Sequence, residues 1–527
     1  MLPLTLHHLL WRMLTVHPTS EVVTVTGPAN DLRSTRCTYE QLAWRMEALA
    51  HGLRDEIELG PDDTVTVLDW NDQQHLELLL AVPLTGAKVN SINLRLGGET
   101  LSHLARNPRP KAVVVSSDLF DHPAVGSAIQ ALVEEMRSTG VITVAITPPG
   151  GRPTAPDTIS YESLIQANLG RRWEEVLEDE NAPAFIFHTS GTTGLPKSYE
   201  VTHRAAVLHC LSQATVEATG LSSRDRVLPL APFFHVNGWG LPLTAALTGA
   251  SLVLSGGDLN PARIAKVMQQ ENVTVAAAVP TVWFDVCAAI ERGEATRPSA
   301  LREVLTGGSP LPESVWKSIR STLGAGVATA WGMTETMACS TYERERPHER
   351  AGKPIPLVEL DLQETVASTA GLDTPPGRLR VRGPFVIGNT TEPGAWFTTG
   401  DIATIDEDGS LTLRDRENDL IKSGGEWIAP AEIEQHLCTH PDVVAAAVIP
   451  VSHPKWIERP RAFVVLHREP EFGELIEEAL TAHLAHAFPR WWLPDQIVIV
   501  DELPITAVGK LDKRSLRKIA ESQKEKV

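Results

Sequence analysis

The sequence has little cysteine, and none of it is clustered. Five cysteines are spread over 527 residues, and no two of them stand at CxxC spacing. An odd number at wide spacing argues against a disulfide framework and against a CxxC metal site, and it favours a reducing compartment. We therefore expect a cytoplasmic protein.

Long apolar runs are also missing. The first fourteen residues, MLPLTLHHLLWRML, are interrupted by two histidines and an arginine, and no cationic leader or small-residue cleavage site accompanies them. This pattern predicts a helix rather than a signal peptide. The most apolar later stretch, residues 273–290, is broken by Pro280 and Asp285, so it is not expected to span a membrane.

An excess of positive charge is absent as well. The chain has 47 Lys and Arg residues against 66 Asp and Glu residues, a formal net charge of −19. Such a field repels phosphates, which excludes a general binder of nucleic acid or of anionic membranes. A phosphate ligand would have to be held locally, by backbone N–H groups, a few Lys or Arg side chains and Mg²⁺.

The length and the patterning predict a layered α/β protein of at least two domains. Hydrophobic residues make up 42% and charged residues 21%, which is typical of globular chains, and no repeat of 20–50 residues occurs. Strand and helix patterns alternate, which favours largely parallel sheets. The expected elements are a helix opened by a Thr38–Gln41 capping box, a strand at Thr64–Leu68, a helix at His75–Leu84, a strand at Ala112–Val115 and a surface connection at 148–156.

The character of the chain changes near residue 417. The last 110 or so residues are expected to form a small α+β domain of their own. Its predicted elements are a helix after Pro430, strands at Val443–Val451 and Ala462–Leu466, a helix at Phe472–Phe488 and a strand at Gln496–Val500, followed by a basic tail.

The strongest local signal is a polar loop that follows an apolar strand. Phe185–His188 leads into a Ser/Thr/Gly run that ends at Lys197. Glycines let successive N–H groups face one anion, while hydroxyls and the lysine add donors and charge. The loop is not a Walker A motif, because Pro196 stands where that motif needs glycine. The alternative is a polar surface turn, which a run of nine such residues makes unfavourable.

This loop, TSGTTGLPK, resembles the signature loop of the acyl-adenylate-forming superfamily, and the resemblance extends over nearly the whole chain. The segments FFHVNGWGLP, VPTVW, AWGMTET, KSGGEW and RWWLP look most similar to the medium-chain fatty acyl-CoA and methylmercaptopropionyl-CoA ligases. The resemblance implies an α/β fold with a large N-terminal adenylating domain, residues 1–417, and a small mobile α+β C-terminal domain, residues 418–527.

The resemblance also implies roles for particular residues. Thr334 would touch phosphate, Glu335 would hold Mg²⁺, and Asp401 and Arg416 would bind the ribose. A carboxylate suits both a hard dication and a vicinal diol. The remaining nucleotide contacts would come from Thr189, Ser190, Gly191, Thr192, Thr193, Gly194, Lys197, Gly308, Ser309, Trp331, Gly332 and Met333.

Three further residues take their expected roles from the same resemblance. Lys510, in Pro-x-Thr-x-x-Gly-Lys, matches the catalytic-lysine loop, where an ammonium would bridge the attacking carboxylate and the α-phosphate. Asn418 stands at the hinge of the domain rotation, where relatives usually have Asp or Lys. Lys422, with the glycines at 424 and 425, would line the second half-reaction.

His235 is a candidate for the wall of the acyl pocket, close to the reacting carboxylate. The alternatives are a nucleophile's base, a metal ligand or a structural aromatic cluster, and neither a Ser-His-Asp spacing nor a second histidine at ligand spacing supports the first two. The pocket would be completed by Trp239, Thr281, Trp283, Gly307, Gly308, Ser309, Trp331 and Met333.

Three departures from the family pattern accompany these motifs. Ser198 replaces a glycine beside the triphosphate, Glu200 adds negative charge nearby, and Ile457 stands where related branches have glycine after tryptophan. None of them removes a residue that adenylation requires, but each bears on the acid and on the acceptor.

The expected function is that of an AMP-forming acid–CoA ligase using ATP, Mg²⁺ and coenzyme A on a medium-chain fatty or aryl acid. The first alternative keeps adenylation but changes the acid or the acceptor, as in carrier-protein loading, amide formation or nitrite activation by a diazotase. A nucleotide-binding regulator without catalysis and a phosphotransferase are the others; the latter lacks Walker A and kinase signatures. Neither nucleic acid nor a membrane is an expected partner, and a homodimer is left open.

Overall fold

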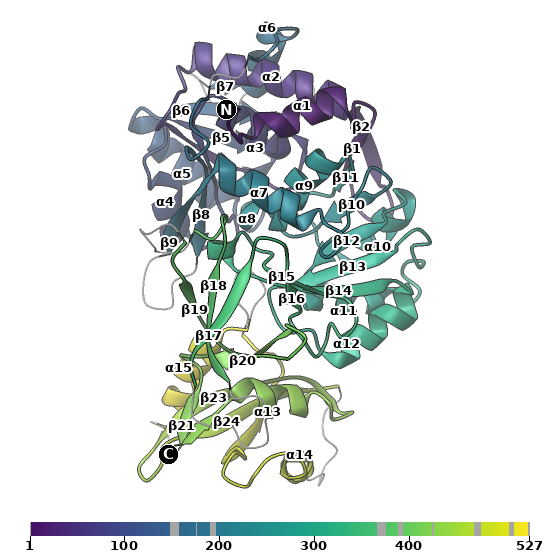
Figure 1. Cartoon of the computed structure of the whole chain (residues 1–527), viewed down its shortest axis with the longest axis vertical. Helices are drawn as coiled ribbons and strands as arrows, with labels where there is room; N and C mark the ends of the chain where they lie inside the picture. The colour runs from purple at the N-terminus through teal and green to yellow at the C-terminus, as the bar shows by residue number, and fades with distance from the viewer. Residues whose placement is uncertain are drawn as a thin grey trace.

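The computed structural model describes residues 2–147, 158–174, 177–189, 196–365, 376–387, 394–423, 426–467, 476–504 and 511–524. Figure 1 shows two large sheets with their helices in the upper part of the molecule, and a four-stranded sheet that leads down to a smaller unit at the C-terminal end. Within the described residues, no helix is long and apolar enough to cross a membrane.

The first large sheet has seven strands, in the order β7-β6-β5-β3-β4-β8-β9. All neighbours are parallel except β8 and β9, which form an antiparallel pair. The predicted strands at 64–68 and 112–115 are confirmed. The bounds are β3 Thr64–Leu68, β4 Lys88–Ser91, β5 Ala112–Ser116, β6 Ile142–Ile146, β7 Ile159–Ser160, β8 Pro183–Thr189 and β9 Lys197–Thr202.

The second large sheet has nine strands, in the order β16-β15-β14-β13-β12-β10-β11-β1-β2. Strands from β1 to β14 along this path are parallel, so their carboxyl ends meet at one edge. The bounds are β1 Glu21–Thr26, β2 Arg33–Thr38, β10 Arg226–Pro229, β11 Ser251–Leu254, β12 Val275–Ala278, β13 Glu303–Gly307, β14 Gly326–Trp331, β15 Thr341–Glu343 and β16 Lys353–Pro354.

Helices cover both sheets, and some are shared between them. The largest buried apolar cluster draws on both sheets and on α1, α2, α3, α7 and α9, which unites the two layers in one core. The bounds are α1 His7–Thr15, α2 Tyr39–Glu56, α3 Gln73–Leu84, α4 Gly98–Arg106, α5 Gly126–Ser138, α6 Tyr161–Asn168, α7 His203–Gln213, α8 Val236–Trp239, α9 Leu241–Thr248, α10 Pro261–Gln270, α11 Pro280–Glu291 and α12 Glu313–Ser318. Short helical turns cover Ser117–Leu119, Ile319–Leu323 and Thr334–Thr336.

Local sequence signals placed several of these helices correctly. The Thr38 hydroxyl accepts from the Gln41 N–H at 3.2 Å and the Gln41 side chain accepts from the Thr38 N–H at 2.9 Å, which is the predicted capping box of α2. The apolar N-terminal stretch forms α1 and buries Leu9, Leu10 and Met13. The apolar run after residue 273 divides into β12 and α11, and all five cysteines are free. The predicted connection at 148–156 lies outside the described residues.

An antiparallel four-stranded sheet follows, in the order β17-β18-β19-β20. Its last strand ends at Arg416, two residues before Asn418. The bounds are β17 Glu359–Thr365, β18 Gly377–Arg382, β19 Phe397–Ile405 and β20 Leu411–Arg416.

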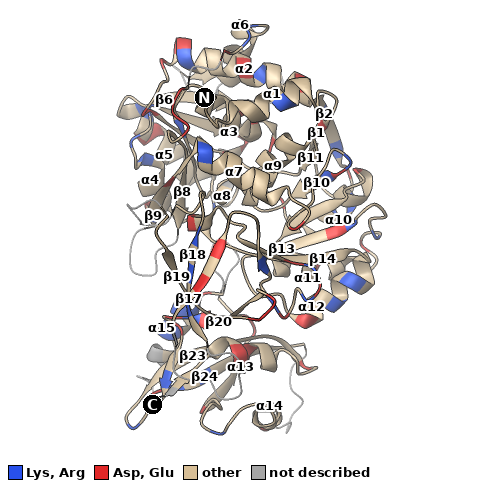
Figure 2. Ribbon diagram, in the orientation of Figure 1, with Lys and Arg blue, Asp and Glu red and all other residues tan. Residues whose placement is uncertain are grey.

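The C-terminal part builds its own sheet, β22-β21-β24-β23, with β25 parallel to β24. Its apolar side chains form clusters separate from those of the large sheets. The strands and helices predicted after residue 430 are present, with the helix predicted from Phe472 described only from Ile476, because residues 468–475 lie outside the described residues. Figure 2 shows acidic and basic residues interspersed along α2 and α12 in the upper part. The bounds are β21 Ile421–Ser423, β22 Glu426–Ile428, α13 Pro430–Leu437, β23 Val443–His453, β24 Ile457–Leu466, α14 Ile476–Ala485, β25 Gln496–Ile499 and α15 Lys513–Lys524.

Candidate active site

The candidate phosphate loop connects the two strands of a hairpin. β8 ends at Thr189 and β9 begins at Lys197, and these two residues are paired across the hairpin. The predicted contacts Ser190, Gly191, Thr192, Thr193 and Gly194 lie outside the described residues. Both ends of the loop are therefore placed side by side, with the exposed Lys197 at the end where the chain returns.

Hydrogen bonds fix the base of this hairpin. The His188 ring contacts the Ser198 hydroxyl at 3.0 Å and the Asn90 side chain at 2.7 Å. Burial lowers the pKa of His188 to about 4, so the ring is neutral at pH 7 and bonds both partners without adding charge. Ser198, one of the departures, thus has a defined partner at the loop.

The negative charge of Glu200 is balanced by a neighbouring strand. Its carboxylate pairs with the Lys88 ammonium of β4 at 2.9 Å. The lysine side chain is 14% exposed and the glutamate side chain is 50% exposed. The extra carboxylate near the loop therefore belongs to a local ion pair and adds little net field toward a phosphate.

A tight turn after β14 holds Trp331, Gly332, Met333, Thr334 and Glu335. A Cβ at Gly332 would lie 2.0 Å from the carbonyl oxygen of Ala338, so only glycine fits there. Two later residues, Met337 and Ala338, have φ of 59° and 74°. Left-handed backbone costs a non-glycine residue about 1–2 kcal/mol, and strain of this kind gathers at functional sites.

Glu335 connects this turn to the hairpin. The residue is 8% exposed, and its carboxylate lies near the Tyr199 hydroxyl of β9, close enough to act on that phenol. Burial and the adjacent carboxylate together raise the pKa of Tyr199 to about 12, so the phenol remains a donor at physiological pH. This proximity brings the predicted metal ligand to the strand that ends the phosphate loop.

The donor set around Glu335 fits a hard cation that shares its ligands with phosphate. Carboxylate and hydroxyl oxygens from Glu335 and Thr334 suit Mg²⁺, which usually keeps one or two protein carboxylates and takes its other ligands from phosphates and water. Among the described residues, no group of three or more His, Cys, Asp or Glu side chains could cage a metal ion alone. Glu335 is therefore suited to hold Mg²⁺ together with a nucleotide.

Asp401 brings three predicted residues together beneath this turn. Its carboxylate accepts from the Trp331 indole at 3.3 Å and pairs with the Arg416 guanidinium at 2.8 Å. Asp401 on β19 and Arg416 on β20 are direct partners in the sheet register, and Asp401 is only 4% exposed. A carboxylate fixed in this way keeps lone pairs on both oxygens for a vicinal diol.

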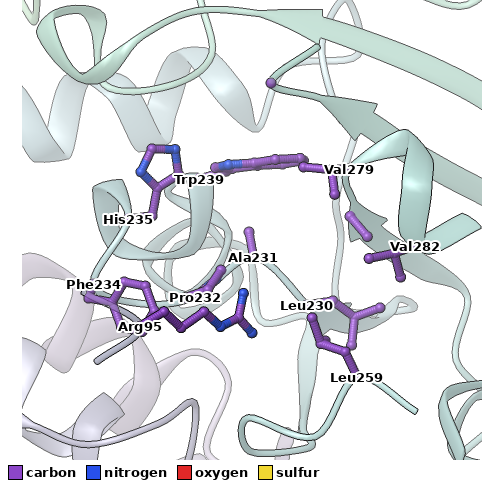
Figure 3. A pocket seen from close by; sticks show the side chains of 12 residues that line it. Arg95, Leu230, Ala231, Pro232, Phe234, His235, Trp239, Leu259, Val279 and Val282 are labelled. Carbon is purple, nitrogen blue, oxygen red and sulfur yellow. The ribbon is translucent and has the colours of Figure 1, made fainter. Parts of the chain in front are cut away.

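A small apolar cavity of about 50 Å³ lies at the carboxyl ends of β10, β12 and β13 of the second large sheet, and Arg95 reaches it from the segment after β4. Figure 3 shows His235 and Trp239 on one side of it and Leu230, Leu259 and Val282 on the other. The two predicted wall residues of the FFHVNGWG segment therefore line it, together with Gly308. The lining residues are Arg95, Leu230, Ala231, Pro232, Phe234, His235, Trp239, Leu259, Ala278, Val279, Val282 and Gly308.

Arg95 is a lining residue that the sequence reasoning missed. It lies between β4 and α4, its guanidinium carbon stands 5.8 Å from the Trp70 ring centre, and burial lowers its pKa. The sequence signal at this position is the run NLRLGG, in which the arginine stands two residues before the first of two glycines at a helix start. No single-sequence pattern connects that run to the pocket.

Other residues predicted for the pocket lie elsewhere. Trp283 is fully buried in the core behind the sheet, where its indole donates to the Ala278 carbonyl at 3.1 Å. Trp331 is directed to Asp401, and Thr281 is exposed. Gly307 ends β13, where a Cβ would lie 2.8 Å from the Ala330 carbonyl oxygen, so its role is close packing before Gly308 and Ser309.

The predicted hinge lies in a turn between two sheets. The Arg416 carbonyl accepts from the Asp419 and Leu420 N–H groups, and Asn418 is exposed without a positive φ. The Lys422 ammonium stands 5.5 Å from the Trp427 ring centre. Lys510 and the glycines at 424 and 425 lie outside the described residues.

Ile457 adopts a backbone conformation that favours glycine. Its φ is +71° and its side chain is 59% exposed, in the turn that joins β23 to β24. A β-branched residue at positive φ is an outlier. The departure at this position therefore carries local strain without apolar burial to offset it.

Comparison with known proteins matches most of the chain to two family models. The family model described as "AMP-binding enzyme" matches residues 14–388, and that of the "AMP-binding enzyme C-terminal domain" matches residues 432–510. The first span encloses the turn after β14 and the cavity, and the second begins inside α13 and encloses β23, β24, α14 and β25.

Curated relatives and solved structures agree with that match. A medium-chain-fatty-acid–CoA ligase from Ectopseudomonas oleovorans is 34% identical over 95% of this chain and 93% of its own length. A long-chain-fatty-acid–CoA ligase from Thermus thermophilus is 36% identical over 92% and 90%. The crystal structure of the anthranilate CoA ligase AuaEII with anthranoyl-AMP matches with a TM-score of 0.83 at 23% identity, over 98% of both chains.

Proposed function

Since this chain belongs to the AMP-binding enzyme family, we propose that it is an acid–CoA ligase that works through an acyl-adenylate. The observation that carries the proposal is the position of the turn after β14, which sets Glu335 beside Tyr199 of β9, the strand after the phosphate loop, and Trp331 against Asp401. A nucleotide at that point would have its phosphates at the hairpin, its ribose at Asp401 and its α-phosphate toward the cavity.

In the first half-reaction, an oxygen of the substrate carboxylate attacks the α-phosphorus of ATP. The bond between that phosphorus and the bridging oxygen breaks, and pyrophosphate leaves with the bond's electron pair. Glu335, with Tyr199 beside it, would hold Mg²⁺, and the ion would supply positive charge to the phosphate oxygens. Lys510 supplies the cation between the two approaching anions.

The ribose is positioned by a preformed carboxylate. Asp401 is already oriented by Trp331 and Arg416, so binding a diol costs little side-chain ordering. Thr334 and the N–H groups of the strained turn lie beside the expected α-phosphate. These groups orient the phosphorus for in-line attack, which is the main contribution a protein makes to such transfers.

The acid is a medium-chain fatty acid or an aryl acid. Pro232, Leu230 and Val279 give the cavity apolar walls, and Trp239 lies across one side of it. A volume of about 50 Å³ is far below the roughly 300–1,000 Å³ of pockets that enclose drug-sized ligands. A long tail would therefore have to displace wall side chains, so the cavity favours a compact acid; the names of the curated relatives, which include a medium-chain and a long-chain ligase, do not distinguish chain lengths.

The second half-reaction transfers the acyl group to a thiol. The thiolate sulfur of coenzyme A attacks the acyl carbon, the C–O bond to AMP breaks, and AMP leaves as the anion. The small domain, residues 418–527, rotates about Asn418 so that Lys510 withdraws and Lys422 approaches. Rotation is needed because the lysine that serves adenylation occupies space that the thiol requires.

The test is ATP–pyrophosphate exchange over a panel of fatty acids, aryl acids and nitrite. Exchange should depend on one acid class and should fall by about 10³-fold in Lys510→Ala, since the cation stabilises the transition state. Lys518→Ala, an exposed lysine of α15, is the matched control and should exchange like the wild type.

The nature of the products separates the alternatives. AMP formed only when coenzyme A is added would support the ligase, whereas AMP formed with an amine or a carrier protein instead would keep adenylation and replace the acceptor. ADP as product, or exchange unchanged in Lys510→Ala, would contradict the proposal.

A further inference from the structure

Asp415, in the four-stranded sheet, makes a buried contact with helix α13 of the C-terminal part. It is the penultimate residue of β20, three positions before Asn418, and it is 9% exposed. One carboxylate oxygen accepts from the N–H of Arg416 at 2.7 Å, and the other accepts from the N–H of Ala431 at 2.9 Å. Ala431 is the second residue of α13, on the far side of the predicted hinge.

This contact supplies the N-terminal cap that the residue directly before α13 does not provide. The residue before the helix is Ala429, which has no side chain to bond the first-turn N–H groups, and Pro430 at the first position has no N–H. The next backbone N–H of that turn belongs to Ala431, and it donates to the Asp415 carboxylate. An aspartate cap is among the strongest, but here it comes from the other side of Asn418.

Charged groups from each adjoining helix face the same carboxylate. The Lys513 ammonium at the start of α15 and the Glu434 carboxylate on α13 are paired at 2.7 Å, and both act on Asp415. Lys513 also lies within range of Asp419, whose carboxylate is bonded to Arg517 at 2.6 Å. The buried Asp415 carboxylate therefore has the Lys513 ammonium and the Glu434 carboxylate near it. Arg416 contributes only its backbone N–H.

We propose that Asp415 is a positioning residue for the two-step reaction: its bond to the first turn of α13 latches the small domain in the present orientation, and its release accompanies the rotation about Asn418. The inference rests on the proposed function, because it assigns the latch to the alternation between half-reactions. It goes beyond that function in naming the contact that must break.

The latch depends on pH in a definite direction. Burial raises the pKa of Asp415 to about 7, with Lys513 and the two N–H groups opposing and Glu434 reinforcing that shift. A released, solvated aspartate would return toward its ordinary value near 4. The latched orientation binds the proton more tightly, so it is favoured at low pH and weakens as the pH rises from about 4 through about 7.

The first experiment measures orientation without catalysis. Spin labels are placed at the exposed positions Glu349 and Glu478, after the half-buried Cys37 and Cys438 are changed to alanine. The wild-type distance distribution should contain the latched distance, and Asp415→Ala should depopulate it about fivefold, as expected for loss of one cap. Asp415→Asn, which keeps an acceptor and cannot ionise, should retain it and should lose the pH dependence.

A matched control separates the latch from a general loss of stability. Thr38→Ala removes a cap of the same kind from α2 at 3.2 Å, far from the hinge, and should leave the distance distribution unchanged. A wild-type distribution in Asp415→Ala, or an equal change in Thr38→Ala, would overturn the proposal.

The second experiment compares the half-reactions at single turnover. The rate of acyl-adenylate formation and the rate of thioester formation from isolated acyl-adenylate should change in opposite directions in Asp415→Ala, which alters their ratio by about fivefold. A purely structural role would lower both rates together. If no acid supports exchange in the wild type, the proposed function fails while the distance measurement still decides the latch.

Discussion

At the residue scale, Asp401 is the side chain whose geometry most sharply predicts an effect on nucleotide binding. Asp401→Asn would place an amide where a carboxylate now accepts from Trp331 and pairs with Arg416. A hydrogen bond to a charged group contributes about 1.5–3 kcal/mol. We expect the KM for ATP in pyrophosphate exchange to rise about 10- to 100-fold, with little change in kcat.

The control for this substitution lies just past the end of the same strand. Asp406 pairs with Arg350 at 3.1 Å, and Arg350 keeps Asp408 as a second partner at 3.0 Å, so Asp406→Asn should leave the KM for ATP unchanged. A normal KM in Asp401→Asn, or a drop in kcat alone, would contradict a role in ribose binding.

Residue roles were predictable where a motif carried them and unpredictable where only packing decides. Trp331, Asp401 and Arg416 are separated by up to 85 positions, and the resemblance to the family predicted that they share a ligand; the structure brings them into contact. Trp283 was assigned to the pocket because tryptophan suits an apolar wall, but it serves the core equally well and lies there. Trp283 lies on α11, and which face of a helix is directed to a cavity rather than to the core depends on tertiary packing that one sequence does not reveal.

At the scale of elements, the hairpin of β8 and β9 is joined to the turn after β14 through Tyr199 and Glu335. Tyr199→Phe keeps the ring and removes the hydroxyl, leaving a carboxylate that is 8% exposed without this donor. We expect the MgATP-dependent kcat/KM to fall about tenfold and the Mg²⁺ concentration for half-maximal exchange to shift, because Glu335 loses its orientation.

The matched variant for this test is Tyr161→Phe, which removes a hydroxyl bonded to a different buried carboxylate, Glu77, at 2.8 Å. It should lower the melting temperature without altering the Mg²⁺ requirement. Equal Mg²⁺ titrations for Tyr199→Phe and the wild type would show that the hydroxyl does not position the ligand.

Elements themselves were largely predictable. The capping box that opens α2 and the short buried strands β3 and β5 follow from local chemistry and periodicity. The strand after the phosphate loop was harder, because KSYEVT mixes exposed polar and buried apolar residues and only its antiparallel pairing with β8 makes it a strand. Pairing with another strand depends on the folded structure, and the residues of one strand do not reveal it.

At the scale of the whole molecule, buried histidines set the response to acid. Burial lowers the pKa values of His75, His203 and His209 to about 4, and all three are at most 1% exposed. Their pKa values in the unfolded chain are near 6.5. The stability that the neutral rings contribute is complete above pH 6.5 and is lost as the pH falls toward 4.

Denaturant unfolding between pH 4 and pH 8 measures this dependence. With His188, whose pKa is also lowered to about 4, the free energy of unfolding should decrease below pH 6.5 with a slope of up to four protons, and His209→Leu should reduce that slope by about one. Asp415 acts in the opposite sense, since its raised pKa favours the folded arrangement at lower pH. A flat profile from pH 6.5 to 4 would contradict neutral, buried histidines.

The position of β1 has a consequence for how the chain is synthesised. β1 enters the second large sheet beside β11, so Val22 pairs with Leu252, about 230 residues later in the chain. At roughly 5–20 residues per second, a ribosome needs on the order of 10–50 s to deliver that partner. During this interval the apolar strand EVVTVT has no β11 to pair with, so one of its edges is exposed. A holding chaperone near the ribosome would then protect the nascent protein from aggregation.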